Sequence, residues 1–150
     1  MTTGNLRPPR LRPGALNLAE FLAQPAPPHC GALAVFAGTV RNLHDERAVT
    51  GIRYHAYAPL AEKRLAEIEE EGARRYGVRL AVAHAVGELK VGEISVVVVA
   101  RAGHRGEAFA ACRWAIDAIK RSVPIWKEER YADGAAEFLE GNPLRPVSEP

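Results

Sequence analysis

The run Ile94–Ala100, with the sequence ISVVVVA, constrains the fold more than any other part of this chain of 150 residues. Four consecutive valines favour a β-strand, and a strand that is apolar on both faces has to be covered on both sides. Gly31–Val40 (GALAVFAGTV) and Val78–Val86 are further apolar runs of strand length. We therefore expect a sheet in which Ile94–Ala100 is a central, buried strand.

Apolar residues at helical spacing predict helices between these strands. The expected ranges are Leu18–Gln24 behind the N-cap Asn17, Leu60–Tyr76 between Pro59 and Gly77, and Glu107–Arg121. Proline in a first turn and glycine after a last turn are typical helix boundaries. The buried face of the third helix is predicted to carry Phe109, Cys112, Ala115, Ile116 and Ile119.

Three more strands complete the expected sheet. Val49–Tyr57 is predicted to return beside Gly31–Val40 as a hairpin-like pair across the charged loop Arg41–Arg47, and Gly87–Gly92 is predicted to be a turn. Ile125–Tyr131 and Ala135–Leu139 form the last expected pair. Two main helices and about six strands in mixed order predict a single α+β domain with a mixed or antiparallel sheet, not a doubly wound parallel sheet.

Length and charge bound the possible functions. The chain fits one domain, which we place at residues 15–141, between tails with little fixed structure at 1–14 and 142–150. A formal net charge of +2, with acidic residues mixed among the basic ones, argues against nucleic-acid binding as the main activity. A compact site for a small anion remains compatible with this charge.

Cysteines and apolar segments indicate a cytoplasmic protein. Cys30 and Cys112 are the only cysteines and lack metal-ligand spacing, so both are interpreted as buried or half-buried thiols, although a disulfide between them stays possible. The segment Met1–Pro13 has no apolar core typical of a signal peptide, and no apolar run is long enough to span a membrane. We expect no metal, no cofactor and no membrane contact.

The segment Lys120–Lys127 (KRSVPIWK) is the strongest candidate for a functional site. Pro124 ends the preceding helix because it lacks a backbone N–H and favours extended geometry at the residue before it. The chain therefore turns sharply, and two lysines on different elements can face one cavity. Such a lysine can act as acid or base when burial or other cations lower its pKa. A solvated basic helix end explains the same residues equally well.

Two other basic positions fit an anion site. His104 and Arg105 open a helix directly after a strand, where free N–H groups attract anions, and Arg41 follows Gly38 at the end of another strand. Ordinary solvated loop residues would look the same. The chain has no nucleophile elbow, no phosphate-binding glycine loop, no dinucleotide fingerprint and no histidine pair at metal-ligand spacing.

Three segments together resemble the large catalytic subunit of molybdopterin synthase, the MoaE family. They are GALAVFAGTVRN, VGEISVVVVARAGHRGEAF and IDAIKRSVPIWKEE, and the resemblance covers about residues 17–140. It implies an α/β-hammerhead fold and a homodimer that binds two copies of a small ubiquitin-like sulfur-carrier subunit, giving a heterotetramer. The carrier's C-terminal Gly-Gly thiocarboxylate would enter a pocket of this chain. There it would supply the sulfur with which the enzyme converts cyclic pyranopterin monophosphate into the molybdopterin dithiolene.

The resemblance also implies roles for particular residues. Lys120 and Lys127 are expected to be the catalytic pair of this sulfurtransferase, with Lys120 as general acid or base. The remaining expected substrate contacts are Thr39, Val40, Arg41, His104, Arg105, Glu128 and Glu129, and the partner protomer is expected to complete the phosphate site. No role beyond possible lid motion is transferred to the loop Asn42–Thr50.

Two other functions stay open at this point. A non-catalytic docking module for a ubiquitin-like tail or a small phosphorylated metabolite would keep the pocket without the chemistry. A minor nucleic-acid-binding domain would require a steep salt dependence of binding, which the modest net charge does not favour.

Overall fold

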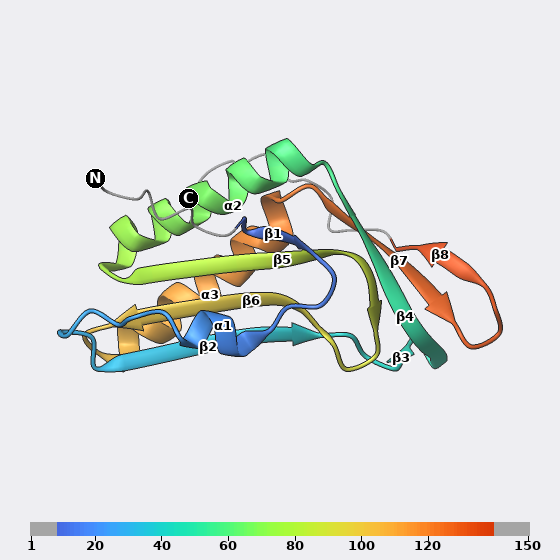
Figure 1. Ribbon diagram of the computed structural model, residues 1–150, viewed down its shortest axis with the longest axis horizontal. Helices are drawn as coiled ribbons and strands as arrows, with labels where there is room; N and C mark the ends of the chain where they lie inside the picture. The colour runs from blue at the N-terminus through green and yellow to red at the C-terminus, as the bar shows by residue number, and fades with distance from the viewer. Residues whose placement is uncertain (1–8, 140–150) are drawn as a thin grey trace.

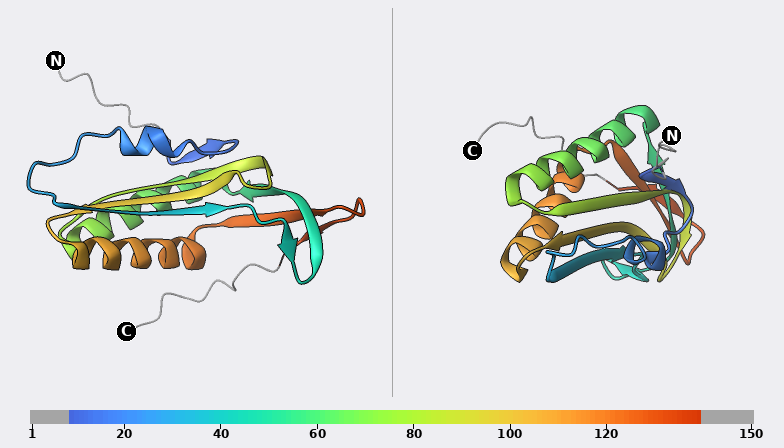
Figure 2. Two further views of the ribbon diagram at one scale, coloured as in Figure 1. Left: turned by 90° about the horizontal axis from the view of Figure 1, so that it is seen from below. Right: turned by 60° about the vertical axis from the view of Figure 1, so that its left-hand side comes forward.

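The computed structural model describes residues 9–139, which form three layers. Figure 1 shows the sheet at the centre, and Figure 2 shows β1 and α1 on one side of it and α2 and α3 on the other. This single α+β arrangement confirms the predicted fold class. In chain order the elements are β1 (Leu11–Pro13), α1 (Leu18–Leu22), β2 (Ala32–Thr39), β3 (Leu43–His44), β4 (Arg47–Ala56), α2 (Ala58–Tyr76), β5 (Arg79–Lys90), β6 (Ile94–Ala102), α3 (Arg105–Ser122), β7 (Ile125–Tyr131) and β8 (Ala136–Phe138).

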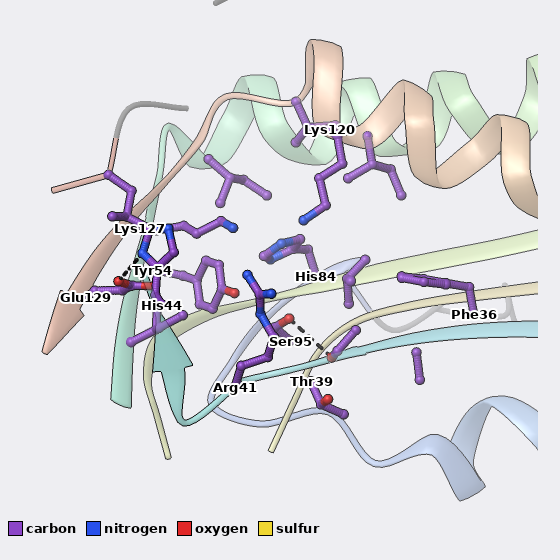
Figure 3. Close-up of a pocket in the computed structure, with 18 residues that line it drawn as sticks. Phe36, Thr39, Arg41, His44, Tyr54, His84, Ser95, Lys120, Lys127 and Glu129 are labelled. Atoms are coloured by element: carbon purple, nitrogen blue, oxygen red, sulfur yellow. Dashed lines mark hydrogen bonds and ion pairs between the residues drawn. The ribbon is translucent and has the colours of Figure 1, made fainter. Parts of the chain in front are cut away.

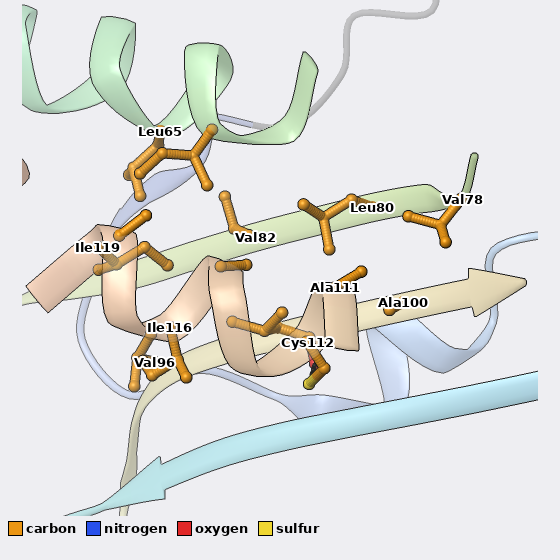
Figure 4. Packing of buried hydrophobic residues seen from close by; sticks show 14 of the residues in the cluster. Leu65, Val78, Leu80, Val82, Val96, Ala100, Ala111, Cys112, Ile116 and Ile119 are labelled. Carbon is orange, nitrogen blue, oxygen red and sulfur yellow. Dashed lines mark hydrogen bonds between the residues drawn. The ribbon is translucent and has the colours of Figure 1, made fainter. Parts of the chain in front are cut away.

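The valine run lies at the centre of the core, as predicted. β6 pairs antiparallel with β2 on one edge and with β5 on the other, so it is an interior strand of the sheet. Val96 and Val98 face α2 and α3 and pack in one cluster with Leu65 of α2 (Figure 4). Val97 belongs to a second cluster on the opposite face, together with Phe21 of α1. Apolar side chains on both faces of one strand therefore hold the three layers together.

The helix boundaries follow the predicted signals. Pro59 lies in the first turn of α2, and Gly77 ends that helix in the left-handed conformation with φ of 66°. On α3 the predicted inward residues are buried with one exception, because Phe109 is 67% exposed. The small Ala108 faces the sheet instead, at 1% exposure, and the adjacent position on a helix points about 100° away. The prediction for Phe109 was therefore wrong.

The predicted pairing of the first strand was also wrong. β2 pairs with β6, whereas β4 pairs with β3, β5 and β7. β2 is almost entirely apolar and pairs with the apolar β6, whereas β4 carries Arg47 and Arg53 and pairs with β7, which also carries charged residues. Sequence neighbours therefore did not become sheet neighbours.

β5 is longer than expected and changes partner along its length. It pairs with β6 up to His84 and with β4 from Gly87 to Lys90, so the predicted turn at Gly87–Gly92 is largely strand. Gly87 has φ of 91°, a conformation that L-residues with side chains rarely adopt, and it marks the change of partner. This change brings β4 and β7 next to the end of α3.

The N-terminal segment is ordered further than predicted. We expected residues 1–14 to be a tail, but β1 pairs in parallel with β5, and Arg10 lies 2.9 Å from Glu69 of α2 in a salt bridge. Backbone hydrogen bonds and a half-buried ion pair therefore fix residues 10–13. The predicted C-terminal tail at 142–150 lies outside the described residues, and within residues 9–139 no helix is long and apolar enough to cross a membrane.

Candidate functional site

A pocket of about 550 Å³ opens where the end of α3 meets β7 and the end of β2. Figure 3 shows Lys120 from α3 and Lys127 from β7 reaching into the same space, near the ring of His84. Arg41, after β2, lines the pocket as well. The complete lining is Phe36, Ala37, Gly38, Thr39, Arg41, His44, Ile52, Tyr54, His84, Ser95, Val96, Ile119, Lys120, Val123, Ile125, Lys127, Glu129 and Leu139.

The corner between α3 and β7 brings the two lysines together. α3 ends at Ser122, and Val123 is extended with φ of −87° and ψ of 126°, as expected before a proline. The carbonyl of Pro124 accepts a hydrogen bond from the N–H of Tyr57, which fixes the corner against the start of α2. The predicted meeting of Lys120 and Lys127 in one cavity is confirmed as a matter of geometry.

The strand period decides which residues of β7 reach the pocket. Successive side chains of a strand point to opposite faces, so Lys127 and Glu129 line the pocket together. Glu128 points to the other face, where its carboxylate lies 3.9 Å from His55 and 3.9 Å from Arg130. The structure therefore places Glu129 in the pocket and Glu128 outside it.

The pocket lining contains three basic side chains, those of Arg41, Lys120 and Lys127, and one carboxyl group, that of Glu129. The pKa of Lys120 is lowered, first by burial and then by the positive charges of Lys127 and Arg41. The side chain of Lys120 is open to the cavity, and the protein surrounds its ammonium group on the other sides. A lowered pKa makes a lysine a better acid or base near neutral pH, and the excess of basic groups favours an anionic ligand.

His84 is a neutral group between the lysines. Burial lowers its pKa to about 4, and the charges of Lys120 and Lys127 act in the same direction, whereas the hydrogen bond between Nδ1 and the carbonyl of Ala85 opposes them. At neutral pH the imidazole carries no charge, so Nδ1 holds the proton that the carbonyl accepts. Nε2 is then the ring nitrogen that can accept a hydrogen bond.

The end of β2 places Thr39 and Arg41 at the rim of the pocket, where both side chains are exposed. The register shifts between Gly38 and Thr39, and a Cβ at Gly38 would lie 2.6 Å from Cγ1 of Val96, so a glycine is required for this close approach. Val40 is 3% exposed and packs in the core, and its N–H donates to the carbonyl of Glu93. Only the first and last of the three expected residues 39–41 line the cavity.

His104 and Arg105 do not lie in this pocket. They are exposed at the start of α3, fifteen residues before Lys120, a separation of roughly 22 Å along the helix. Within one chain they therefore form a separate basic patch. They reach a pocket of this kind only if a second copy of the chain brings them there, as the family resemblance implies.

Sequence reasoning missed several polar residues that line the pocket. They are His44, Tyr54, His84 and Ser95, from β3, β4, β5 and β6. The pKa of Tyr54 is raised, mainly by burial, and its ring packs edge-on against His84 at 5.0 Å between centroids. A lone histidine inside the apolar run Val78–Val86 was the available signal for His84. Among the described residues, no group of three or more histidine, cysteine or acidic side chains is placed to hold a metal ion.

The fold and the pocket define a small α+β domain with a basic, ligand-sized cavity, and comparisons with known proteins give its family. The MoaE protein family model matches residues 11–122. The molybdopterin synthase catalytic subunit of Oryza sativa subsp. indica is 45% identical over 122 residues, which cover 81% of this chain and 63% of the rice protein. This chain belongs to the MoaE protein family, as the sequence resemblance predicted. The match spans less than two thirds of the rice protein's length.

Other relatives match over a larger share of their length. The molybdopterin synthase catalytic subunit of Halalkalibacterium halodurans is 37% identical over 134 residues, which cover 89% of this chain and 85% of that protein. The crystal structure of molybdopterin synthase from Staphylococcus aureus aligns with a TM-score of 0.82 at 30% identity, covering 87% of this chain and 96% of that one. A complex of subunits 1 and 2 of molybdopterin-converting factor from Helicobacter pylori aligns with a TM-score of 0.70 at 25% identity, over 86% and 88% of the two chains.

Proposed function

We propose that this chain is the catalytic subunit of a molybdopterin synthase and acts as a sulfurtransferase in molybdenum cofactor biosynthesis. It would transfer sulfur from the thiocarboxylated C-terminus of a small carrier subunit to cyclic pyranopterin monophosphate, forming the dithiolene of molybdopterin. The observation that carries the proposal is the meeting of Lys120 and Lys127 with Arg41 in one pocket. The named relatives and the two-subunit complex from Helicobacter pylori support it.

Within this reaction the pocket residues take distinct roles. Lys120 is the general acid or base, because its lowered pKa suits proton transfer near neutral pH. Lys127 supports the substrate and the carrier tail, and both ammonium groups stabilise negative charge that develops as sulfur is added. Thr39, Val40, Arg41 and the two glutamates Glu128 and Glu129 would contribute to substrate binding, although Val40 and Glu128 could do so only from outside the cavity lining.

The assembly we propose is a homodimer with two carriers. His104 and Arg105 would then bind the substrate's phosphate in the pocket of the partner protomer, since they lie roughly 22 Å from Lys120 along their own helix. We place the reaction in the cytoplasm, because Cys30 and Cys112 are free thiols, as expected in a reducing compartment.

The test is a single assay with a matched control. The protein is incubated with thiocarboxylated carrier and cyclic pyranopterin monophosphate, and dithiolene product is measured. Lys120→Ala should lower turnover by roughly 10²–10⁴-fold, the usual contribution of a positioned acid or base, while carrier binding stays nearly intact. Lys63→Ala, on the exposed face of α2, should have no effect. Near-normal turnover by Lys120→Ala would remove the assigned role, and carrier binding without product from the wild type would favour a docking module.

A further inference from the structure

The carboxyl group of Glu129 is buried at the pocket wall and held by two hydrogen-bond donors. Glu129 is 5% exposed, and its Oε2 lies 2.8 Å from Nδ1 of His44 and 2.9 Å from the hydroxyl of Tyr131, which donates to it. A carboxylate accepts hydrogen bonds, so Nδ1 of His44 carries the proton in this contact. Both donors bind the same oxygen, which leaves Oε1 available to the pocket.

His44 reaches Glu129 from a tight hairpin. β3 pairs with the start of β4, and the two residues between them, Asp45 and Glu46, have φ of 48° and 64°. Left-handed backbone at non-glycine residues is costly and persists where surrounding contacts hold it. One such contact is His44 with Glu129, and another is Arg47, which stacks 3.5 Å from the ring centre of Tyr131. Both strands of the hairpin are thus tied to β7.

The hydrogen bonds to Glu129 matter because a lysine is close to it on the same strand. Lys127 is two residues away and faces the same pocket, a spacing of roughly 7 Å along a strand. A flexible lysine and a free buried carboxylate at that spacing would pair, because an unpaired buried charge is costly. Within residues 9–139, however, no carboxylate lies within 4.0 Å of the Lys127 ammonium group. His44 and Tyr131 satisfy Glu129 instead.

We propose that His44 is a positioning residue that holds Glu129 away from Lys127. It keeps the lysine free for the anionic part of the substrate and directs Oε1 of Glu129 towards an N–H or O–H donor of the same substrate. This inference rests on the proposed function, since it assigns parts of one substrate to the two groups. His44 lies in the segment 42–50, to which the sequence resemblance assigned no substrate contact.

The test compares two substitutions of the same residue. His44→Leu removes the donor and should lower kcat/KM for the pterin substrate by roughly 10- to 100-fold, the loss expected when a hydrogen bond to a charged group is removed. His44→Asn retains a side-chain N–H near the position of Nδ1 and should recover most of that loss. Asp45→Asn is the matched control, because it removes only the carboxylate that lies 3.4 Å from the other ring nitrogen and retains a residue that tolerates the left-handed conformation.

A second measurement separates positioning from simple stability. In a Glu129→Gln background, His44→Leu should cost little further kcat/KM, because the group that it positions has already lost its charge. Wild-type kcat/KM for His44→Leu, or an equal loss in both backgrounds, would overturn the inference. A wild-type protein that forms no dithiolene product would instead overturn the proposed function and, with it, the assignment of substrate groups.

Discussion

The buried His84 predicts a specific loss of stability below neutral pH. Its pKa is about 4 in the folded protein, against an ordinary value of 6.5, so the unfolded chain binds more protons than the folded one between these values. His84 therefore has no effect on the pH dependence of the free energy of unfolding above about pH 6.5. As the pH drops from 6.5 towards 4, it makes the free energy of unfolding fall. The loss amounts to about 2 kcal/mol at pH 5 and about 3 kcal/mol below pH 4.

Urea unfolding at pH 8, 7, 6 and 5 measures this contribution. His84→Gln removes the titrating group, so between pH 8 and pH 5 the wild type should lose about 2 kcal/mol more stability than the variant. His29→Gln is the matched control, because His29 is exposed, and it should retain the wild-type pH dependence. Equal pH dependence in the wild type and His84→Gln would show that His84 is not held neutral by its surroundings.

The same experiment separates the causes of the shift. Burial is the largest cause, and the charges of Lys120 and Lys127 are smaller ones. Lys120→Met should therefore retain most of the pH dependence and remove only part of it. Complete loss of the pH dependence in Lys120→Met would mean that charge repulsion dominates, contrary to this ranking.

Two further outcomes follow from the architecture. If each site uses Arg105 of the partner protomer, Arg105→Ala should weaken substrate binding. Mixing this variant with Lys120→Ala should restore about a quarter of wild-type turnover, because half of the randomly mixed dimers hold one intact site out of two. No recovery after subunit exchange would argue for a site within one chain. Gly51→Ala should lower the free energy of unfolding by about 1–3 kcal/mol in urea melts, because its Cβ would lie 2.8 Å from the backbone carbonyl of Leu89, whereas Gly106→Ala, with open space around it, should not lower it.

The sequence predicted those parts of the fold that depend on local chemistry. Four valines in succession indicated a strand with two covered faces, and Pro59 and Gly77 marked the ends of α2 where the structure has them. These features depend on residues that are neighbours in the chain. The same reasoning ended the third helix at Arg121, one residue before its observed end at Ser122, and began the next strand at Ile125, as observed.

Sheet partners and pocket membership could not be predicted in the same way. The sequence does not show that β2 pairs with β6 and not with β4, because that choice depends on how two distant apolar faces are buried together. His84 and Tyr54 meet in the pocket only because β5 changes partner at Gly87, and a shift of one residue in either strand would turn its side chain to the other face. The sequence shows a lone histidine in an apolar run, but the residues that it contacts depend on the pairing register of the strands.

The arrangement of charges in the pocket lowers the stability of the fold. Arg41, Lys120 and Lys127 repel one another, which contributes to the lowered pKa of Lys120, and the hydrogen bonds to Glu129 keep the carboxyl group of this lining from pairing with Lys127. Such an arrangement is not the most stable one for the protein alone, since a lysine paired with that carboxylate would relieve both the repulsion and the burial of charge. An anionic ligand relieves the repulsion without that pairing, because its negative charge takes the place that the carboxylate would have filled. The corner at Pro124 brings the two lysines together, and their positive charge favours an anionic substrate.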